Sequence, residues 1–251
     1  MKIIISPAKQ MRVDVDTFDA TSTPIFFKQA TEIRDYLQSL SIDELKKVWN
    51  VNDKLLKLNY QRLSTMNFND ELLTPAILGF DGLQYKYMSP DLFTQPALDF
   101  IQDNLRILSS FYGVLRPFDG IKPYRLEMRA KVHVNGTKNL HEFWNHTWFD
   151  ELAREDNVIL NLASKMYASQ IEKYQKLHPE VRFITCIFGH YDRNKDKVIR
   201  DNTYAKMARG EMVRFIAENQ ITDYKKLSKF SDFGYNCVSS SRDKLLFLRE
   251  K

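Results

Sequence analysis

Residues 2–9 read Lys2-Ile3-Ile4-Ile5-Ser6-Pro7-Ala8-Lys9. The short apolar, β-branched run predicts a strand that runs into a turn. Polar and basic residues begin where this strand stops, and the same layout recurs after the apolar runs at 106–108 and 158–160. In open α/β sheets, ligands bind beyond the carboxyl ends of the strands. This layout therefore sets both the expected fold and the expected place of a site.

Similar short runs elsewhere predict further strands. The predicted strands are 2–5, 76–78, 106–108, 158–160, 182–188, 197–200, 235–238 and 244–248. Helical patterns lie between many of them. Apolar residues spaced four, three and four apart from Phe26 to Leu37 predict one helix. Ser41 and Glu44 form a capping box that opens a second, and the string 89–91 (Ser-Pro-Asp) opens a third.

The order of these elements predicts the fold class. The early strands alternate with helices, whereas the last ones resemble an antiparallel meander. No internal repeat and no linker rich in Pro, Gly or Ser divides the 251 residues. We therefore predict a single α/β domain over residues 1–251, with a mixed sheet flanked by helices.

The composition, with 43% hydrophobic and 27% charged residues, is that of a globular protein. No apolar run approaches the roughly 20 residues that span a bilayer or the core of a signal peptide. We therefore expect a cytoplasmic protein without a membrane partner. Cys186 and Cys237 each fall inside a predicted strand and are expected to be core thiols. The oligomeric state is left open.

Positive charge is concentrated in one segment. The chain carries a net charge of +5. Residues 106–131 hold six basic and two acidic residues, which makes this segment +4 and leaves +1 for the rest of the chain. A local surplus of this kind is typical of a surface that binds a polyanion, so we expect a nucleic acid partner.

The residues that follow the strands are expected to converge on a basic cleft. The candidate nucleic-acid or anion-binding residues are Ser6, Lys9, Tyr112, Gly113, Arg116, Tyr124, Arg125, Asn161, Ser164, Lys206 and Arg209. Ser6 and Ser164 can each cap a helix start and leave backbone N–H groups facing an anion. The basic residues would neutralise phosphates, and Tyr112 and Tyr124 would lie near the cleft. For any one segment, simple helix capping or a surface ion pair is the alternative.

Residues 204–219 predict the helix that carries Lys206 and Arg209. Ala208 and Met212 fall on one side of it, and Lys206, Arg209 and Gly210 fall on the other. Glycine in mid-helix costs about 1 kcal/mol relative to alanine, which suggests that something approaches the backbone closely at Gly210. A solvated basic face with a tolerated glycine is the alternative.

Five strings carry a resemblance to a known family. They are residues 5–9 (Ile-Ser-Pro-Ala-Lys), 112–117 (Tyr-Gly-Val-Leu-Arg-Pro), 123–128 (Pro-Tyr-Arg-Leu-Glu-Met), 161–164 (Asn-Leu-Ala-Ser) and 204–210 (Tyr-Ala-Lys-Met-Ala-Arg-Gly). In order, and over nearly the whole chain, they closely resemble those of the YaaA-like peroxide-stress protein family. The resemblance implies a positively charged cleft, a helix-hairpin-helix element and DNA binding. It also implies protection from hydrogen peroxide by limiting unincorporated intracellular iron.

The chain departs from that family's pattern in the loop at 80–87 and at two places that bear more directly on function. The helix-hairpin-helix would fall near residues 41–66, where the connector 51–54 (Val-Asn-Asp-Lys) contains no glycine to bring backbone N–H groups against phosphate. Relatives often carry an acidic residue where Met166 stands, so a catalytic acid at that position is not available here.

These patterns leave more than one function open. The leading hypothesis is a protein that binds double-stranded or distorted DNA. The alternative is an enzyme that acts on a nucleotide or a flipped base, for which Glu127 is the nearest candidate acid or base. No cofactor is expected, because the sequence has no Walker A loop, no GxGxxG and no GxSxG motif. No metal is expected at His141 and His146, because the two rings would lie about 140° apart around a helix. Iron sequestration, a third possibility, has no visible ligand cluster.

Overall fold

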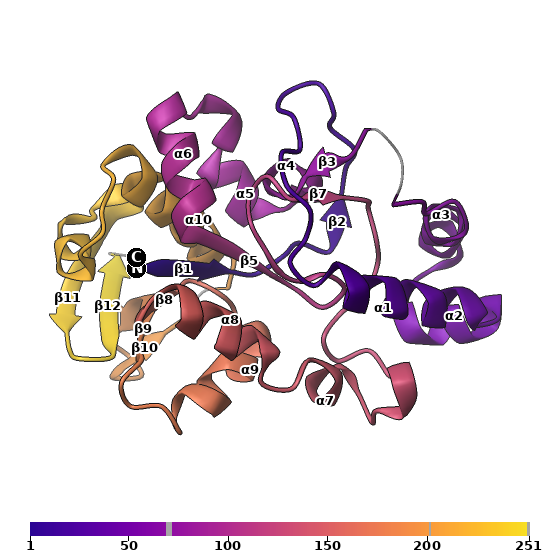
Figure 1. Cartoon of the computed structure of the whole chain (residues 1–251). Helices are drawn as coiled ribbons and strands as arrows, with labels where there is room; N and C mark the ends of the chain where they lie inside the picture. Colours follow the sequence, from indigo (N-terminus) through magenta and orange to yellow (C-terminus); the bar gives the residue numbers. More distant parts are fainter. Residues whose placement is uncertain (69–71, 201, 250–251) are drawn as a thin grey trace.

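A mixed sheet forms the centre of the molecule (Figure 1). The computed structural model describes residues 1–68, 72–200 and 202–249, and within them this sheet has eight strands. In spatial order the strands are β11 (Tyr235–Ser240), β12 (Lys244–Arg249), β9 (Arg182–Asp192), β8 (Val158–Asn161), β1 (Lys2–Ile5), β5 (Leu105–Ser109) and β6 (Gly113–Leu115), with β10 (Lys197–Ile199) paired to β9. The predicted α/β class with a mixed sheet is confirmed.

Five neighbouring strands, from β12 through β9, β8 and β1 to β5, run parallel. Their carboxyl ends therefore meet at one edge of the sheet. The chain that leaves β1 leads to β5 on one side, whereas the chain that leaves β8 leads through α9 (Lys165–Gln175) to β9 on the other. β1 and β8 thus flank a topological switch point, the place where open α/β sheets leave a crevice.

Helices cover both faces of the sheet. Figure 1 shows α5 (Leu83–Met88), α6 (Gln95–Asn104) and α10 (Asn202–Glu218) over one face, and α8 (Thr147–Glu155) with α9 over the other. The remaining α-helices of the described residues are α1 (Phe27–Ser39), α2 (Ile42–Trp49), α3 (Asp53–Ser64), α4 (Ala76–Gly79) and α7 (Leu140–Trp144). None of the helices in the described part of the chain is long and apolar enough to cross a membrane.

The central strands read as continuous apolar runs because both of their faces are covered. Ile3, Ile4 and Ile5 are fully buried, and every residue of β5 is buried. Two short strand pairs lie outside the sheet and join loops near its edge: β2 (Gln10–Met11) pairs with β4 (Phe80–Asp81), and β3 (Thr74–Pro75) pairs with β7 (Gly120–Ile121).

α2 and α3 form a helical hairpin at one end of the molecule (Figure 1). The predicted capping box is present, since the Ser41 backbone N–H donates to Glu44 at 2.8 Å and the Ser41 hydroxyl accepts from the Glu44 N–H. Asn50 ends α2 in the left-handed conformation with φ of 48°, a conformation usually taken by glycine. The turn therefore lies at 50–52, and Asp53 already begins α3.

Gly210 allows α10 to cross α5 at close range. A Cβ atom on Gly210 would lie 2.2 Å from the backbone oxygen of Gln84 and 2.9 Å from the nitrogen of Met88. The predicted close approach to this glycine is confirmed, and the approaching group is the chain's own helix. Ala208 and Met212 are buried on the predicted packed face.

Three local predictions are wrong. Residues 76–78 begin α4 instead of a strand, because a short apolar run looks alike in a buried helix and a buried strand. Ser89, with φ of 45°, opens only a 3-10 helix at Pro90–Leu92, and its hydroxyl donates to the oxygen of Lys86 instead of capping. β12 runs parallel to β9, so the last strands are not a simple antiparallel meander.

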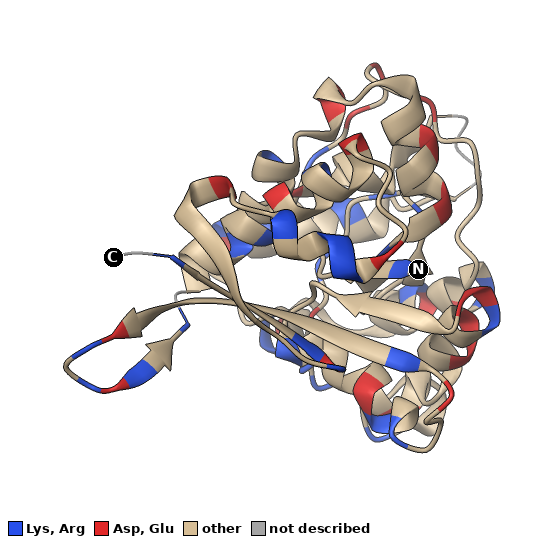
Figure 2. Cartoon of the chain, turned by 90° about the vertical axis from the view of Figure 1, so that its left-hand side faces the viewer, with Lys and Arg blue, Asp and Glu red and all other residues tan. Residues whose placement is uncertain are grey.

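Much of the charge in segment 106–131 is balanced by partners in the fold. Arg106 is buried in β5 and donates two hydrogen bonds to the Glu155 carboxylate, at 2.8 and 2.7 Å. The Lys2 ammonium lies 3.6 Å from the same carboxylate. Figure 2 shows basic and acidic residues interspersed over the ribbon. The local surplus in the sequence therefore does not map directly onto one surface.

We expect Glu155→Gln to destabilise the fold by about 3 kcal/mol at pH 7, because the buried Arg106 loses its carboxylate. Burial raises the pKa of Glu155, but the hydrogen bonds and charge of Arg106 outweigh it and hold the pKa below its usual value. The Arg106–Glu155 ion pair therefore contributes its full stabilisation above the unfolded-state pKa of about 4.3, and this stabilisation is lost as the pH falls through the folded-state pKa.

Denaturant unfolding at a series of pH values measures the free energy of unfolding of both proteins. The difference in this free energy between wild type and Glu155→Gln should become smaller below about pH 4. Glu218→Gln, which removes an exposed ion pair with Arg214, is the control and should change stability little at any pH. A difference in the free energy of unfolding between wild type and Glu155→Gln that stays constant down to about pH 2 would contradict the prediction.

We expect Gly210→Ala to lower stability by about 1–3 kcal/mol, even though alanine favours helix, because the added methyl meets the backbone of α5. Chemical denaturation of the variant measures the change. Lys206→Ala, at an exposed position of the same helix, should leave stability almost unchanged. A stabilised Gly210→Ala would show that the helices separate at no cost.

Candidate functional site

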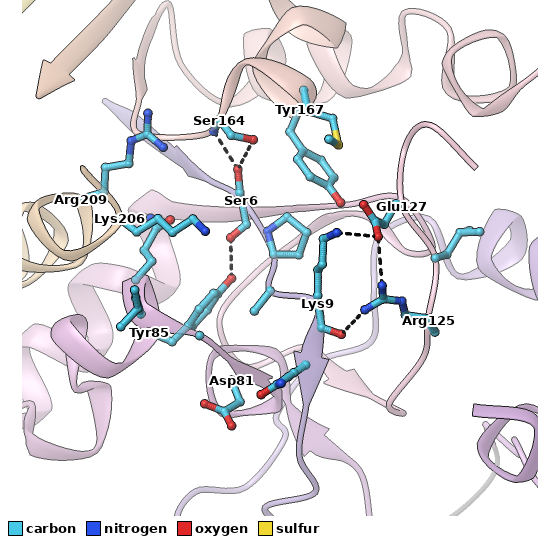
Figure 3. Close-up of a pocket in the computed structure, with 18 of the residues that line it drawn as sticks. Ser6, Lys9, Asp81, Tyr85, Arg125, Glu127, Ser164, Tyr167, Lys206 and Arg209 are labelled. Carbon is cyan, nitrogen blue, oxygen red and sulfur yellow. Dashed lines mark hydrogen bonds and ion pairs between the residues drawn. The ribbon is translucent and has the colours of Figure 1, made fainter. Parts of the chain in front are cut away.

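A pocket of about 460 Å³ opens beside the carboxyl ends of β1 and β8 (Figure 3). We call it the Ser6 pocket. Its lining comes from residues 6–10, 81–85 and 124–127, together with Ser164, Met166, Tyr167, Lys206 and Arg209. It lies at the topological switch point, and it brings together segments that are far apart in the sequence.

A pair of serines joins the two strand ends at the floor of the pocket. The Ser6 hydroxyl accepts a hydrogen bond from the Ser164 backbone N–H at 2.8 Å and donates to the Ser164 hydroxyl at 3.1 Å. Ser164 occupies the N-cap position of α9 but makes no side-chain cap, and no helix follows Ser6 directly. The predicted capping by these serines is therefore wrong, because they bond to each other.

Three buried tyrosines line the pocket. The Tyr85 hydroxyl donates to the backbone oxygen of Ser6 at 2.9 Å, and the Tyr124 hydroxyl lies 2.8 Å from that of Ser109. Burial raises the pKa of Tyr85 and Tyr124 well above the usual range, and it raises the pKa of Tyr167 to about 12. All three phenols are thus neutral at physiological pH and add no charge.

One end of the pocket holds Glu127, whose carboxylate pairs with three cations, Lys9, Arg125 and Arg129. Its Oε1 atom lies 2.9 Å from the Lys9 ammonium and 3.0 Å from a guanidinium nitrogen of Arg125 (Figure 3). Arg125 also donates to the backbone oxygen of Lys9 at 3.1 Å. Glu127, the candidate acid named from the sequence, therefore lines the pocket and engages two of the predicted cations.

The other end carries two cations from α10. The side chains of Lys206 and Arg209 make no hydrogen bond or ion pair within the part of the chain that the structure describes, and the Arg209 Nε atom is buried. Burial lowers the pKa of Arg209, but a guanidinium stays charged at neutral pH. In Figure 3 both side chains lie on the opposite side of Ser6 from Glu127. Both cations are therefore without an ion-pair partner among the described residues, and the second carboxylate of the lining, Asp81, pairs with Lys86 at 3.4 Å.

Seven of the eleven candidate residues line the pocket, and four do not. Tyr112 is fully buried, with its hydroxyl accepting from the Lys122 N–H at 3.0 Å, and Gly113 packs against Trp144 with φ of 79°. Arg116 pairs with the buried Asp119 at 3.0 Å, and the Asn161 side chain accepts from the Ala163 N–H at 2.9 Å.

For Tyr112, Gly113 and Arg116, which follow β5, the reason is the direction of the chain after that strand. Residues 110–112 turn directly into β6, which returns antiparallel along β5 at the edge of the sheet. The turn therefore folds back onto its own strand instead of opening toward the crevice. The sequence contained one sign that Arg116 is not available to a ligand, because Asp119 stands three residues after it, at the spacing of a local ion pair.

Sequence reasoning missed the wall formed by residues 81–85 and by Tyr167. Gly82 opens α5, and a Cβ there would lie 3.0 Å from that of Ala8. No single-sequence pattern distinguishes a pocket tyrosine from a core tyrosine, since both are buried. Met166 also lines the pocket, at the position where the family resemblance suggests an acid.

The donor set around the pocket suits an anion better than a metal ion. Among the described residues no group of three or more His, Cys, Asp or Glu side chains could hold a metal. A second hollow, of about 720 Å³, borders the β9–β10 hairpin and is lined by none of the candidate residues.

Known proteins resemble this chain over nearly its whole length. The family model described as peroxide stress protein YaaA matches residues 1–241. A UPF0246 protein of Lachnoclostridium phytofermentans is 46% identical over 99% of this chain and 96% of its own length. A UPF0246 protein of Pediococcus pentosaceus is 45% identical over 100% of this chain and 99% of its own.

We expect Ser6→Ala to destabilise the protein by about 1 kcal/mol, because the Ser164 N–H loses its acceptor. Amide hydrogen exchange should also become faster at Ser164. Ser228→Ala, which removes an exposed hydroxyl, is the control and should change neither quantity. Unchanged exchange at Ser164 in the Ser6→Ala variant would argue against the serine pair.

Proposed function

Since the chain belongs to the peroxide stress protein YaaA family, we propose that it binds DNA through the cations of the Ser6 pocket during the response to hydrogen peroxide. Membership of the family supports the role in peroxide stress. The proposal adds DNA as the ligand and the cytoplasm as the compartment. It also adds limitation of unincorporated iron, and hence of oxidative DNA damage, as the outcome.

The observation that carries the proposal is the pair of unpaired cations on α10. Lys206 and Arg209 face a shared pocket, and no carboxylate among the described residues pairs with them. Arg209 is partly buried without a counter-charge, which is destabilising unless a ligand supplies the charge, and the exposed Lys206 lies beside it on the same helix. Phosphate groups are the ligands that lysine and arginine bind most often on nucleic acids.

Lys9 and Arg125 would act differently in this proposal. Both are engaged by Glu127, so their net contribution to the field is smaller than that of the α10 pair. Among the cations named from the sequence, Lys206 and Arg209 should therefore account for most of the phosphate binding at this site.

The α2–α3 hairpin is proposed as a second DNA contact, in the manner of a helix-hairpin-helix. Asn50 takes the left-handed conformation at the turn, so the absence of glycine does not prevent a tight connection. Lys46 is held by Asp53 at 2.6 Å. Any contact with phosphate here would rely mainly on the backbone N–H groups at the start of α3.

We expect the double variant Lys206→Ala and Arg209→Ala to bind DNA at least tenfold more weakly than wild type. For each phosphate that the variant no longer neutralises, the slope of log K against log salt should fall by about one. Fluorescence anisotropy with a labelled duplex, measured over a range of salt concentrations, gives both quantities.

Lys225→Ala with Lys226→Ala is the matched control, because it removes the same charge from exposed positions outside the pocket. This control should retain most of the affinity. In cells that lack the protein, wild type and control should restore survival in hydrogen peroxide, and the pocket variant should not. Equal DNA affinity and equal salt slope for both double variants would overturn the proposal.

A further inference from the structure

We propose that the Ser6 pocket holds a single nucleotide unit, with its phosphate on Lys206 and Arg209 and its base directed toward Glu127. This inference rests on the proposed function and narrows it. The unit is either a free mononucleotide or one nucleotide turned out of a DNA strand. The two sources share the same chemistry, and a fluorescence measurement on duplex DNA separates them.

The size of the pocket fits one such unit. Its volume of about 460 Å³ lies within the range of about 300–1,000 Å³ typical of small-ligand sites. A duplex is far larger, since its major groove alone, about 12 Å wide, admits an α-helix. A duplex can therefore lie across the mouth of the pocket, but only one residue of a strand can enter it. Bases that leave the stack are held in pockets of this kind.

The distribution of ion pairs fixes the direction of the unit. Lys206 and Arg209 at one end lack an acidic partner among the described residues. At the opposite end, the carboxylate of Glu127 pairs with three cations, Lys9, Arg125 and Arg129. The donors at the Glu127 end are therefore already engaged, whereas those of Lys206 and Arg209 are open to a ligand. A phosphate is thus expected on Lys206 and Arg209, with the rest of the unit toward Glu127.

The Glu127 end offers the groups that recognise a base. A carboxylate accepts hydrogen bonds at about four lone-pair positions, and three cations contact Glu127, namely Lys9 and Arg125 at Oε1 and Arg129 at Oε2, which leaves an acceptor position for a base. Carboxylates accept from the exocyclic amino groups of bases, and arginine donates to ring nitrogens and carbonyl oxygens. Glu127 and Arg125 together thus present an acceptor beside a donor.

The walls between the two ends are largely apolar. Leu83, Leu126 and Met166 line them together with the three neutral tyrosines. Tyr85 is held in place by its bond to Ser6, and Ser6 is held by Ser164. A flat base can pack on such a surface, because every base has an apolar face. The pocket is also built before any ligand arrives, which lowers the entropic cost of binding.

The first experiment is calorimetric titration of the full-length protein with the four deoxynucleoside 5′-monophosphates, the corresponding nucleosides and inorganic phosphate. We expect one saturable site that prefers at least one mononucleotide over both its nucleoside and inorganic phosphate. Lys206→Ala should lower the affinity for that mononucleotide at least tenfold and leave the affinity for any nucleoside that binds unchanged. The Lys206 side chain is exposed, so this variant should fold, and Lys225→Ala is the matched control.

Glu127→Gln tests the base end separately. The variant should change the order of preference among the four mononucleotides without reducing the affinity for inorganic phosphate. Binding of inorganic phosphate as tightly as every mononucleotide, or an unchanged order in Glu127→Gln, would overturn the inference.

The second experiment identifies the source of the nucleotide. A duplex containing 2-aminopurine opposite a mismatch should become more fluorescent on binding if that nucleotide is turned out, and an excess of mononucleotide should reverse the increase. Mononucleotide binding without any duplex binding would support the pocket assignment with a free nucleotide as ligand, and would overturn the proposed DNA function. Salt-dependent duplex binding that needs Lys206, with neither a fluorescence change nor mononucleotide binding, would overturn this inference and leave the proposed function standing.

Discussion

The close crossing of α10 over α5 is the contact on which the candidate site depends. Gly210 lies directly on the backbone of Gln84, and Gln84 and Tyr85 form part of the pocket wall. The two cations, Lys206 and Arg209, stand on the same helix within four residues of this glycine. One backbone contact therefore sets the distance between the wall of the pocket and its positive end. A larger residue at 210 would move both relative to the strand ends that form the floor.

The sheet supplies the other half of the arrangement. Parallel strands place their carboxyl ends at one edge, and the opposite connections of β1 and β8 leave that edge open between them. The serine pair ties the two ends together across 158 residues of chain. Helix α10 follows later in the sequence and closes the crevice from above the sheet. The pocket is thus assembled from both ends of the chain, so its geometry depends on the complete fold.

The parts of this arrangement that follow local rules could be predicted from the sequence. The apolar run before Ser6 and the helical period around Lys206 each have a pattern that identifies the element, and Gly210 signalled a close approach. The sequence could not show which way the chain turns after β5, and this misplaced Tyr112 and Arg116. It also could not show that Glu127 faces Lys9, because two residues 118 positions apart meet only through the tertiary structure. Surplus charge in a segment says nothing of partners elsewhere, as Arg106 and its buried carboxylate illustrate.

The two cysteines bear on how such a protein can act in peroxide stress. Hydrogen peroxide oxidises the thiolate form of cysteine, so a reactive thiol needs a low pKa and access to solvent. Cys186 is a core thiol as predicted, but Cys237 is only half-buried, so the prediction of a core thiol there is wrong. Burial raises the pKa of the Cys186 thiol far above neutral pH, and partial burial also raises the pKa of Cys237. Both thiols are therefore protonated at physiological pH, and neither has the environment of a peroxide-reactive cysteine. Direct reaction with the oxidant is thus a poor explanation for a role in peroxide stress. Binding at the pocket remains the more direct physical route, because Lys206 and Arg209 line it without an ion-pair partner among the described residues.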